Sequence, residues 1–163
     1  MKFLNKAFDL IFDKNDFWHG AQAPGQIYST SELLGYFNDL TKKIDENMLI
    51  KFQVPKVIHK GKKFLHPVTL CQVGLGAYDK YLISQNSKYL SISIRCVEEL
   101  ISLGDDLRVP YEFALFNQKT NFQSGLIYGQ AISLCLRVAK STKKDQYFRI
   151  AKKYKKNMLR SIE

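Results

Sequence analysis

Residues 66–82 read His66-Pro-Val-Thr-Leu-Cys-Gln-Val-Gly-Leu-Gly-Ala-Tyr-Asp-Lys-Tyr-Leu82, and this stretch decides the fold of the chain. His66 stands at a capping position, and Pro67 follows at the first helical position, where the missing N–H group costs nothing. Apolar residues then recur at helical spacing as far as Ile83. The pattern predicts a helix over residues 67–83, and it can be extended outward in both directions.

Three more helices are predicted after this one. Gln85-Asn86 break the first helix, and Ser87 is expected to cap a second helix that ends before Gly104, a residue suited to the position beyond a helix end. A long aromatic connection leads to a third helix, from near Ser124 to about residue 140. A fourth helix is expected over about 145–160.

The second pair of helices repeats the first pair at an offset of 58 residues. The aligned apolar positions are Tyr89 with Tyr147, Leu90 with Phe148, Ile92 with Ile150, Leu100 with Met158, and Ile101 with Leu159. Repeated αα-hairpins cannot bury their apolar faces alone and must stack on neighbours. The predicted fold is therefore mainly α, built of αα-hairpin repeats, either as a straight solenoid or as an α/α toroid.

The part of the chain ahead of these helices has mixed character. Residues 1–35 are interpreted as an N-terminal extension and loop, in which Trp18 either stacks on a sugar ring or fills the edge of the core. Residues 30–44 have apolar residues at helical spacing, but Gly35 weakens a helix there. Residues 49–65 predict a small β-hairpin around the turn His59-Lys-Gly-Lys62.

Length and composition exclude several classes of protein. With 163 residues, 45% of them hydrophobic and 13% aromatic, the chain is too apolar for a disordered protein. It is also long enough to form a hydrophobic core that needs neither disulfides nor a metal ion for stability. The sequence contains no run of 18 apolar residues, so no transmembrane helix is predicted. Its first residues do not have the pattern of a signal peptide. Cys71, Cys96 and Cys135 are predicted to be buried reduced thiols, so we expect a cytoplasmic protein.

The net charge of +10 is concentrated near the C-terminus, where residues 137–160 hold ten basic groups and one acid. Such a stretch attracts phosphate, anionic lipid or a polyanionic glycan, unless it is simply a solvated helix face. No known nucleic-acid-binding module is present, so nucleic acid is not expected as a partner. The sequence contains no Gly-rich phosphate loop and no histidine pair at metal-ligand spacing, and neither a cofactor nor a metal is predicted.

Three stretches resemble the C-terminal domain of the D-glucuronyl C5-epimerases. Residues 66–82 are similar to that family's Asn-Pro-Val-Thr-Ile-Ala-Gln-Tyr-Gly-Leu and the helix after it, which ends in Tyr-Asp. Residues 124–137, Ser-Gly-Leu-Ile-Tyr-Gly-Gln-Ala-Ile-Ser-Leu-Cys-Leu-Arg, are similar to its Ser-Gly-Met-Ala-Gln-Gly-Gln-Ala-Ile-Ser. Residues 36–40, Tyr-Phe-Asn-Asp-Leu, resemble its Tyr-Tyr-x-Asp-Leu. The resemblance implies that residues 36–163 form part of an α/α toroid.

The resemblance also implies an isomerase that inverts C5 of glucuronic acid within a polysaccharide. A proton leaves the carbon next to the carboxylate and returns on the opposite face, which requires two acid/base groups and a group that stabilises the carboxylate. The catalytic candidates in or near the matched motifs are Tyr36, His66, Tyr111 and Tyr128. The candidates for binding a uronic-acid polysaccharide are Trp18, Gln72, Glu112, Gln130 and Arg137.

Each candidate also has a structural alternative. His66 would cap its helix, the tyrosines would pack in the core, and Arg137 would serve as a structural partner for a carboxylate. Gln72 and Gln130 would bond to backbone groups near helix ends. Four glycines in the predicted helices are expected to allow close helix packing: Gly74, Gly76, Gly125 and Gly129.

The chain departs from the family in two motif positions and in length. His66 replaces the usual Asn, Tyr128 replaces the usual Gln, and the family continues beyond this region with further hairpins and active-site groups. We therefore expect a shortened relative, a fragment, or a subunit that works with a second chain or with copies of itself. Epimerisation is the first functional hypothesis, and a non-catalytic helical module that binds an anionic glycan or a partner protein is the alternative.

Overall fold

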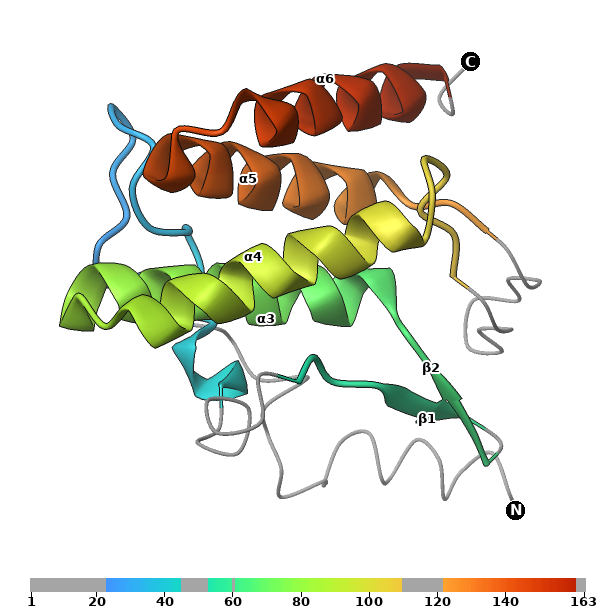
Figure 1. The fold of residues 1–163 in the computed structure, drawn as a ribbon, viewed down its shortest axis with the longest axis horizontal. Coiled ribbons are helices and arrows are strands. Elements are labelled where there is room, and N and C mark those ends of the chain that lie inside the picture. Colours follow the sequence, from blue (N-terminus) through green and yellow to red (C-terminus); the bar gives the residue numbers. More distant parts are fainter. Residues whose placement is uncertain (1–22, 45–52, 60, 110–121, 161–163) are drawn as a thin grey trace.

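Two helical hairpins make up most of the fold (Figure 1). The structure, a computed structural model, describes residues 23–44, 53–59, 61–109 and 122–160. Helix α3 spans Pro67–Ser84 and α4 spans Ser87–Ser102, and after the connection α5 spans Gly125–Thr142 and α6 spans Asp145–Arg160. The prediction of a mainly helical chain is confirmed.

The first hairpin begins and turns through local backbone chemistry. His66 caps α3, since its Nδ1 accepts a hydrogen bond from the N–H of Thr69 at 3.4 Å. The helix ends at Gln85, whose φ of 55° places it in the left-handed region. Asn86, rather than the expected Ser87, caps α4, because its side chain accepts from the N–H of Lys88 at 3.0 Å.

The second hairpin has the same dimensions as the first. Its helices begin at Gly125 and Asp145, each 58 positions after Pro67 and Ser87, and the helix ends differ by 58 as well. Lys143 ends α5 with a φ of 56°, at the position equivalent to Gln85. Helix α5 therefore continues two residues past the expected end near residue 140, because the left-handed residue sets the turn.

Helix α3 lies at the centre of the molecule, packed against α4, α5 and the short 3-10 helix η1 at Thr41–Lys43. It runs side by side with α5 in the same direction, while α4 and α6 return antiparallel to their partners (Figure 1). Almost all of its residues from Thr69 to Asp79 are buried. A helix that is covered on all sides needs no polar face, which explains its apolar sequence.

The segment before α3 is extended rather than helical. Residues 30–44 form isolated bridges, including Tyr28 with Gly35 and Pro24 with Asn38, and contribute only η1 as helix. The predicted hairpin is confirmed as two strands, β1 at Val57–His59 and β2 at Lys62–Phe64, which pair antiparallel. Gly61, with a φ of 77°, lies in its turn.

The expectation for the glycines is confirmed for two of the four. A Cβ at Gly76 would overlap the backbone carbonyl of Leu40, and one at Gly74 would come within 2.5 Å of Leu134. The expectation is wrong for Gly125 and Gly129, because no described residue outside their own stretch of helix comes within 4 Å of such a Cβ. The two motif glycines of α5 therefore lie on an open side of the helix.

Gly76→Ala and Gly129→Ala make the same change in two helices of 18 residues. At position 76 we expect a loss of about 2 kcal/mol in the free energy of unfolding, because a backbone carbonyl cannot move aside as a side chain can. At position 129 we expect a gain of up to about 1 kcal/mol, since Ala favours helix and meets no neighbour. Urea unfolding measures both, and equal effects would contradict the contact of Gly76 with Leu40.

Candidate functional site

The predicted site residues do not converge on one cleft. Tyr36, Gln130 and Arg137 gather in a buried polar cluster between α3 and α5. Tyr128 and His66 lie near the starts of α5 and α3, and each is engaged with its own local neighbours. Three predicted residues lie outside the described part of the chain: Trp18, Tyr111 and Glu112.

Arg137 holds the N-terminal segment against α5. Its Nε donates to the carbonyl of Leu34 and its Nη2 to that of Gly35, both at 2.8 Å. Its Nη1 donates to the hydroxyl of Ser133 at 2.6 Å and to the carbonyl of the same residue at 3.2 Å. Every nitrogen of the guanidinium is therefore engaged within the protein, which favours a structural role over a clamp on a substrate carboxylate.

Asp79 holds the same segment from α3. Its carboxylate accepts the backbone N–H of Tyr36 at 3.0 Å and 3.3 Å for the two oxygens. Burial raises the pKa of Asp79 to about 7, although the bond from Tyr36 and the charge of Arg137 act in the opposite direction. Sequence reasoning missed this residue, but a single acid inside an otherwise apolar helix was the available signal.

Tyr36 lies between these two groups and stays protonated at neutral pH. Its ring centre is 5.7 Å from the guanidinium carbon of Arg137. Burial raises the pKa of its hydroxyl, and this outweighs the opposing effects of Gln130 and Arg137. A tyrosine with a raised pKa donates hydrogen bonds but does not remove a proton from carbon.

Gln130 and Gln72 occupy two different polar environments. Gln130 is buried beside Tyr36, and its Oε1 has no hydrogen-bond partner among the described residues. Gln72 accepts a hydrogen bond from Lys43 of η1, which is itself buried. Burial lowers the pKa of Lys43 to about 8. Within the described residues, neither glutamine forms the hydrogen bond to backbone at a helix end that its structural alternative required.

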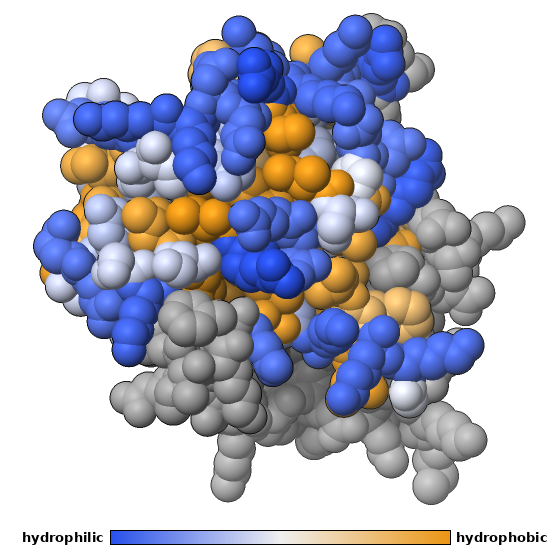
Figure 2. Space-filling model, viewed as in Figure 1, coloured by the Kyte–Doolittle hydropathy of each residue, from blue (hydrophilic) through white to orange (hydrophobic). Residues whose placement is uncertain are grey.

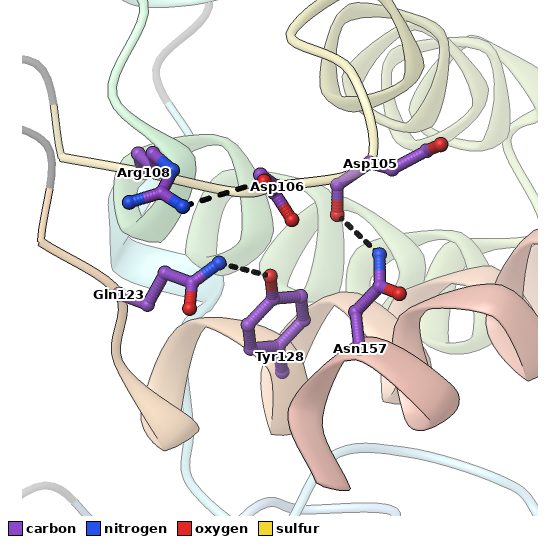
Figure 3. A network of polar contacts seen from close by, with 6 residues as sticks. All are labelled: Asp105, Asp106, Arg108, Gln123, Tyr128 and Asn157. Atoms are coloured by element: carbon purple, nitrogen blue, oxygen red, sulfur yellow. Dashed lines mark hydrogen bonds and ion pairs between the residues drawn. The ribbon is translucent and has the colours of Figure 1, made fainter. Parts of the chain in front are cut away.

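Tyr128 belongs to a polar network at the end of the molecule where α5 begins (Figure 3). Gln123 donates to its hydroxyl at 3.2 Å, and its ring packs 6.4 Å from that of Tyr154. Burial and the nearby charge of Asp106 raise the pKa of Tyr128. The connection after α4 is tied to α6 in the same place, since Asn157 donates to the carbonyl of Asp105 at 3.0 Å.

His66 is a neutral capping group at physiological pH. Burial lowers its pKa to about 4, because the protonated ring would be poorly solvated at this position. Its Nδ1 must stay unprotonated in order to accept the N–H of Thr69. At pH 7 the ring is therefore neutral, with its one proton on Nε2, and no imidazolium is present to act as a general acid.

Among the described residues, no three His, Cys, Asp or Glu side chains gather as metal ligands would. The three cysteines are free and buried, as predicted. A groove of about 400 Å³ lies at the turn between α5 and α6, and none of the predicted site residues lines it. The described catalytic candidates, Tyr36, His66 and Tyr128, thus lie away from this groove.

Comparison with known proteins does not assign the chain to a family. Neither the family models, nor the curated proteins, nor the solved structures contain a match to this chain. No helix in the described part of the chain combines the length and the hydrophobicity needed to cross a bilayer. The functional argument therefore depends on the side chains themselves.

The basic surface predicted from the sequence lies along α6. The helix buries Tyr147, Ala151 and Tyr154 on one side and exposes its lysines and arginines on the other. Figure 2 shows hydrophilic side chains along the edge formed by α6, with apolar surface between them and α4. Lys153 pairs with Asp105 at 2.6 Å and Arg149 with Asp145 at 3.5 Å.

Arg137→Lys tests the clamp on the N-terminal segment. A lysine keeps the charge but cannot bond to two successive carbonyls in a fork, so we expect a loss of about 2 to 3 kcal/mol in the free energy of unfolding. Lys140→Met removes one exposed bond to the carbonyl of Leu33 and should change it by less than about 0.5 kcal/mol. Denaturant unfolding compares the two, and similar effects would refute the clamp.

His66→Asn tests the neutral cap through pH. The unfolded chain binds a proton at His66 below about pH 6.5, whereas the folded chain does so only near pH 4. The stabilisation from this group is thus complete above pH 6.5 and is lost as the pH falls toward 4. Asparagine caps without titrating, so the variant should lose about 1 to 2 kcal/mol less over this range. Unfolding curves at several pH values measure the difference, which stays constant with pH if folding does not lower the pKa of His66.

Proposed function

We propose that this chain is a relative of the D-glucuronyl C5-epimerases that binds a uronic-acid polysaccharide without epimerising it. The proposal joins the resemblance of residues 36–160 to that family with the chemistry of the described side chains. The observation that carries it is the row of exposed cations on α6, which has almost no acidic counterpart.

The arrangement of the helices supports a partial α/α toroid. The first helices of the two hairpins, α3 and α5, lie side by side and parallel, and the second helices return on the outside (Figure 1). Equal helix bounds at an offset of 58 residues are what a repeated hairpin unit requires. In this proposal the two hairpins are successive units of the ring.

The cations of α6 form a surface suited to a polyanion. Lys152, Lys155 and Lys156 are exposed, and no carboxylate among the described residues pairs with them. From Arg149 to Arg160 the row extends over about 17 Å of helix. A polymer with a carboxylate on alternate sugars would meet several of these charges at once, and its binding would weaken as salt is added.

The chemistry of the catalytic candidates supports binding without turnover. Tyr36 and Tyr128 have raised pKa values and keep their protons, and His66 is neutral and occupied as a cap. Removal of a proton from C5 needs a base whose pKa lies near the working pH. The pKa values of Tyr36 and Tyr128 are shifted upward and that of His66 downward, so all three move away from neutral pH.

Retained epimerase activity is the second candidate. It is favoured by one feature, namely that α3 and α5 begin at the same end of the molecule, where the two matched motifs lie (Figure 1). In this case the base would be Asp79, whose pKa is raised to about 7, or a group of a second subunit or of the residues outside the described part. We also propose a reducing, cytoplasmic setting, in line with the three free and buried cysteines.

Binding is tested with a polymer of glucuronate and N-acetylglucosamine. Lys152→Glu combined with Lys155→Glu should weaken binding at least about tenfold at low salt, because two attractions become repulsions. The matched control, Lys62→Glu with Lys63→Glu on the exposed strand β2, makes the same change in net charge and should have a smaller effect. Isothermal titration calorimetry measures the affinity of both double variants. Equal losses of affinity would mean that net charge alone, and not the surface of α6, determines binding.

Turnover is tested separately by deuterium exchange. The protein is incubated with the same polymer in D₂O, and NMR follows the H5 signal of glucuronate. We expect the signal to persist as in a sample without protein. Loss of H5 that disappears in Tyr128→Phe would instead establish the epimerase reaction and overturn the non-catalytic proposal.

A further inference from the structure

Helix α5 presents an apolar face that the described part of the chain leaves uncovered. Residues 125–136 contain no charged side chain, although Gly125, Leu126 and Gly129 are exposed, Leu126 to 59%. The same side continues with Ile132 and Leu136, which are partly buried. A helix face in contact with water is normally polar, so an exposed apolar face of this length marks an interaction site.

The fold itself contains a covered version of this face. On α3 the equivalent residues contact α5. The Sγ of Cys71 approaches the carbonyl of Ile127, Gly74 lies against Leu134, and the hydroxyl of Tyr78 bonds to that of Ser141 at 2.9 Å. The occupant of the face on α3 is therefore a helix, parallel to it and in close contact.

A shift of 58 residues carries this contact surface onto α5. Cys71, Gly74 and Tyr78 correspond to Gly129, Ile132 and Leu136, of which Gly129 is exposed and the other two are partly buried. No atom lies within 4 Å of a Cβ built on Gly129, so the backbone of α5 is open to close approach there. The repeat thus indicates both the position and the kind of partner, which is another helix.

The charge beside the face specifies the chemistry of that helix. The groove of about 400 Å³ at the end of α5 has an apolar floor that includes Leu136, Ala139 and Phe148. Three lysines and one acid line it as well: Lys140, Lys143, Lys144 and Asp145. A second copy packed about a two-fold axis would bring these lysines onto their own counterparts, whereas a partner with carboxylates would neutralise them.

We propose that an amphipathic helix of a partner protein, with an apolar face flanked by Asp and Glu, docks along α5 on Gly129, Ile132 and Leu136. Its apolar face covers these residues as α5 covers α3, and its carboxylates reach Lys140, Lys143 and Lys144. The site is separate from the outward face of α6 proposed to bind glycan, so either proposal can fail without the other.

Two synthetic helices of the length of α5, 18 residues, serve as probes. They share one face of Ala and Leu, and one carries Glu beside this face where the other carries Lys. Fluorescence anisotropy measures their binding to the full chain and to two variants. Gly129→Trp adds bulk to the open face at a position where a Cβ meets no neighbour, and Ser91→Trp places the same bulk on an exposed position of α4 as a control.

The Glu helix should bind the natural chain and Ser91→Trp alike, and Gly129→Trp should weaken it at least about tenfold. Lys143→Glu combined with Lys144→Glu should also weaken it, and the Lys helix should bind the natural chain much less. The proposal is overturned if the Glu helix does not bind at about 1 mM, or if both helices bind equally. Self-association in sedimentation equilibrium that Gly129→Trp abolishes would assign the face to a second copy and equally overturn it.

Discussion

The contact between α3 and α5 is the constraint on which the rest of the structure depends. Neither hairpin can bury its apolar face alone, and the two meet where Gly74 allows Leu134 to approach the backbone of α3. Because α3 is thereby covered by α4, α5 and η1, its sequence carries almost no polar surface. The same contact places the N-terminal segment in a fixed position, since that segment rests on both helices.

A polar clamp fixes this segment where an apolar contact would leave its backbone unsatisfied. Arg137 binds the carbonyls of Leu34 and Gly35, and Asp79 binds the next N–H group, that of Tyr36. Buried peptide groups outside regular structure need such partners, and removal of one leaves them unpaired at a cost of about 1 to 3 kcal/mol. Two residues of the epimerase-like motifs, Tyr36 and Arg137, are thus engaged in holding the fold together.

The surface divides into two regions with different chemistry. On the outward side of α6, Lys152, Lys155 and Lys156 pair with no carboxylate of the described residues and suit an extended polyanion, whereas α5 exposes an apolar strip that ends in a groove lined by lysines. The first region attracts a partner by long-range electrostatics, which does not depend on the partner's shape. The second region requires a partner whose surface is complementary in shape. Together, the two proposals describe a chain that brings a glycan and a protein partner to neighbouring surfaces.

The sequence alone determined the four helices, the small hairpin and the offset of 58 residues, because these depend on local periodicity and on turn chemistry between neighbours in the chain. It also located the basic region and the buried cysteines. Only the tertiary structure decided that Gly76 is packed and Gly129 is open, since a glycine in a helix has the same local signal in both settings. The roles of Asp79 and Arg137 depend on residues more than 40 and 100 positions away, as their hydrogen bonds to Tyr36 and Gly35 show, and no local pattern contains that information.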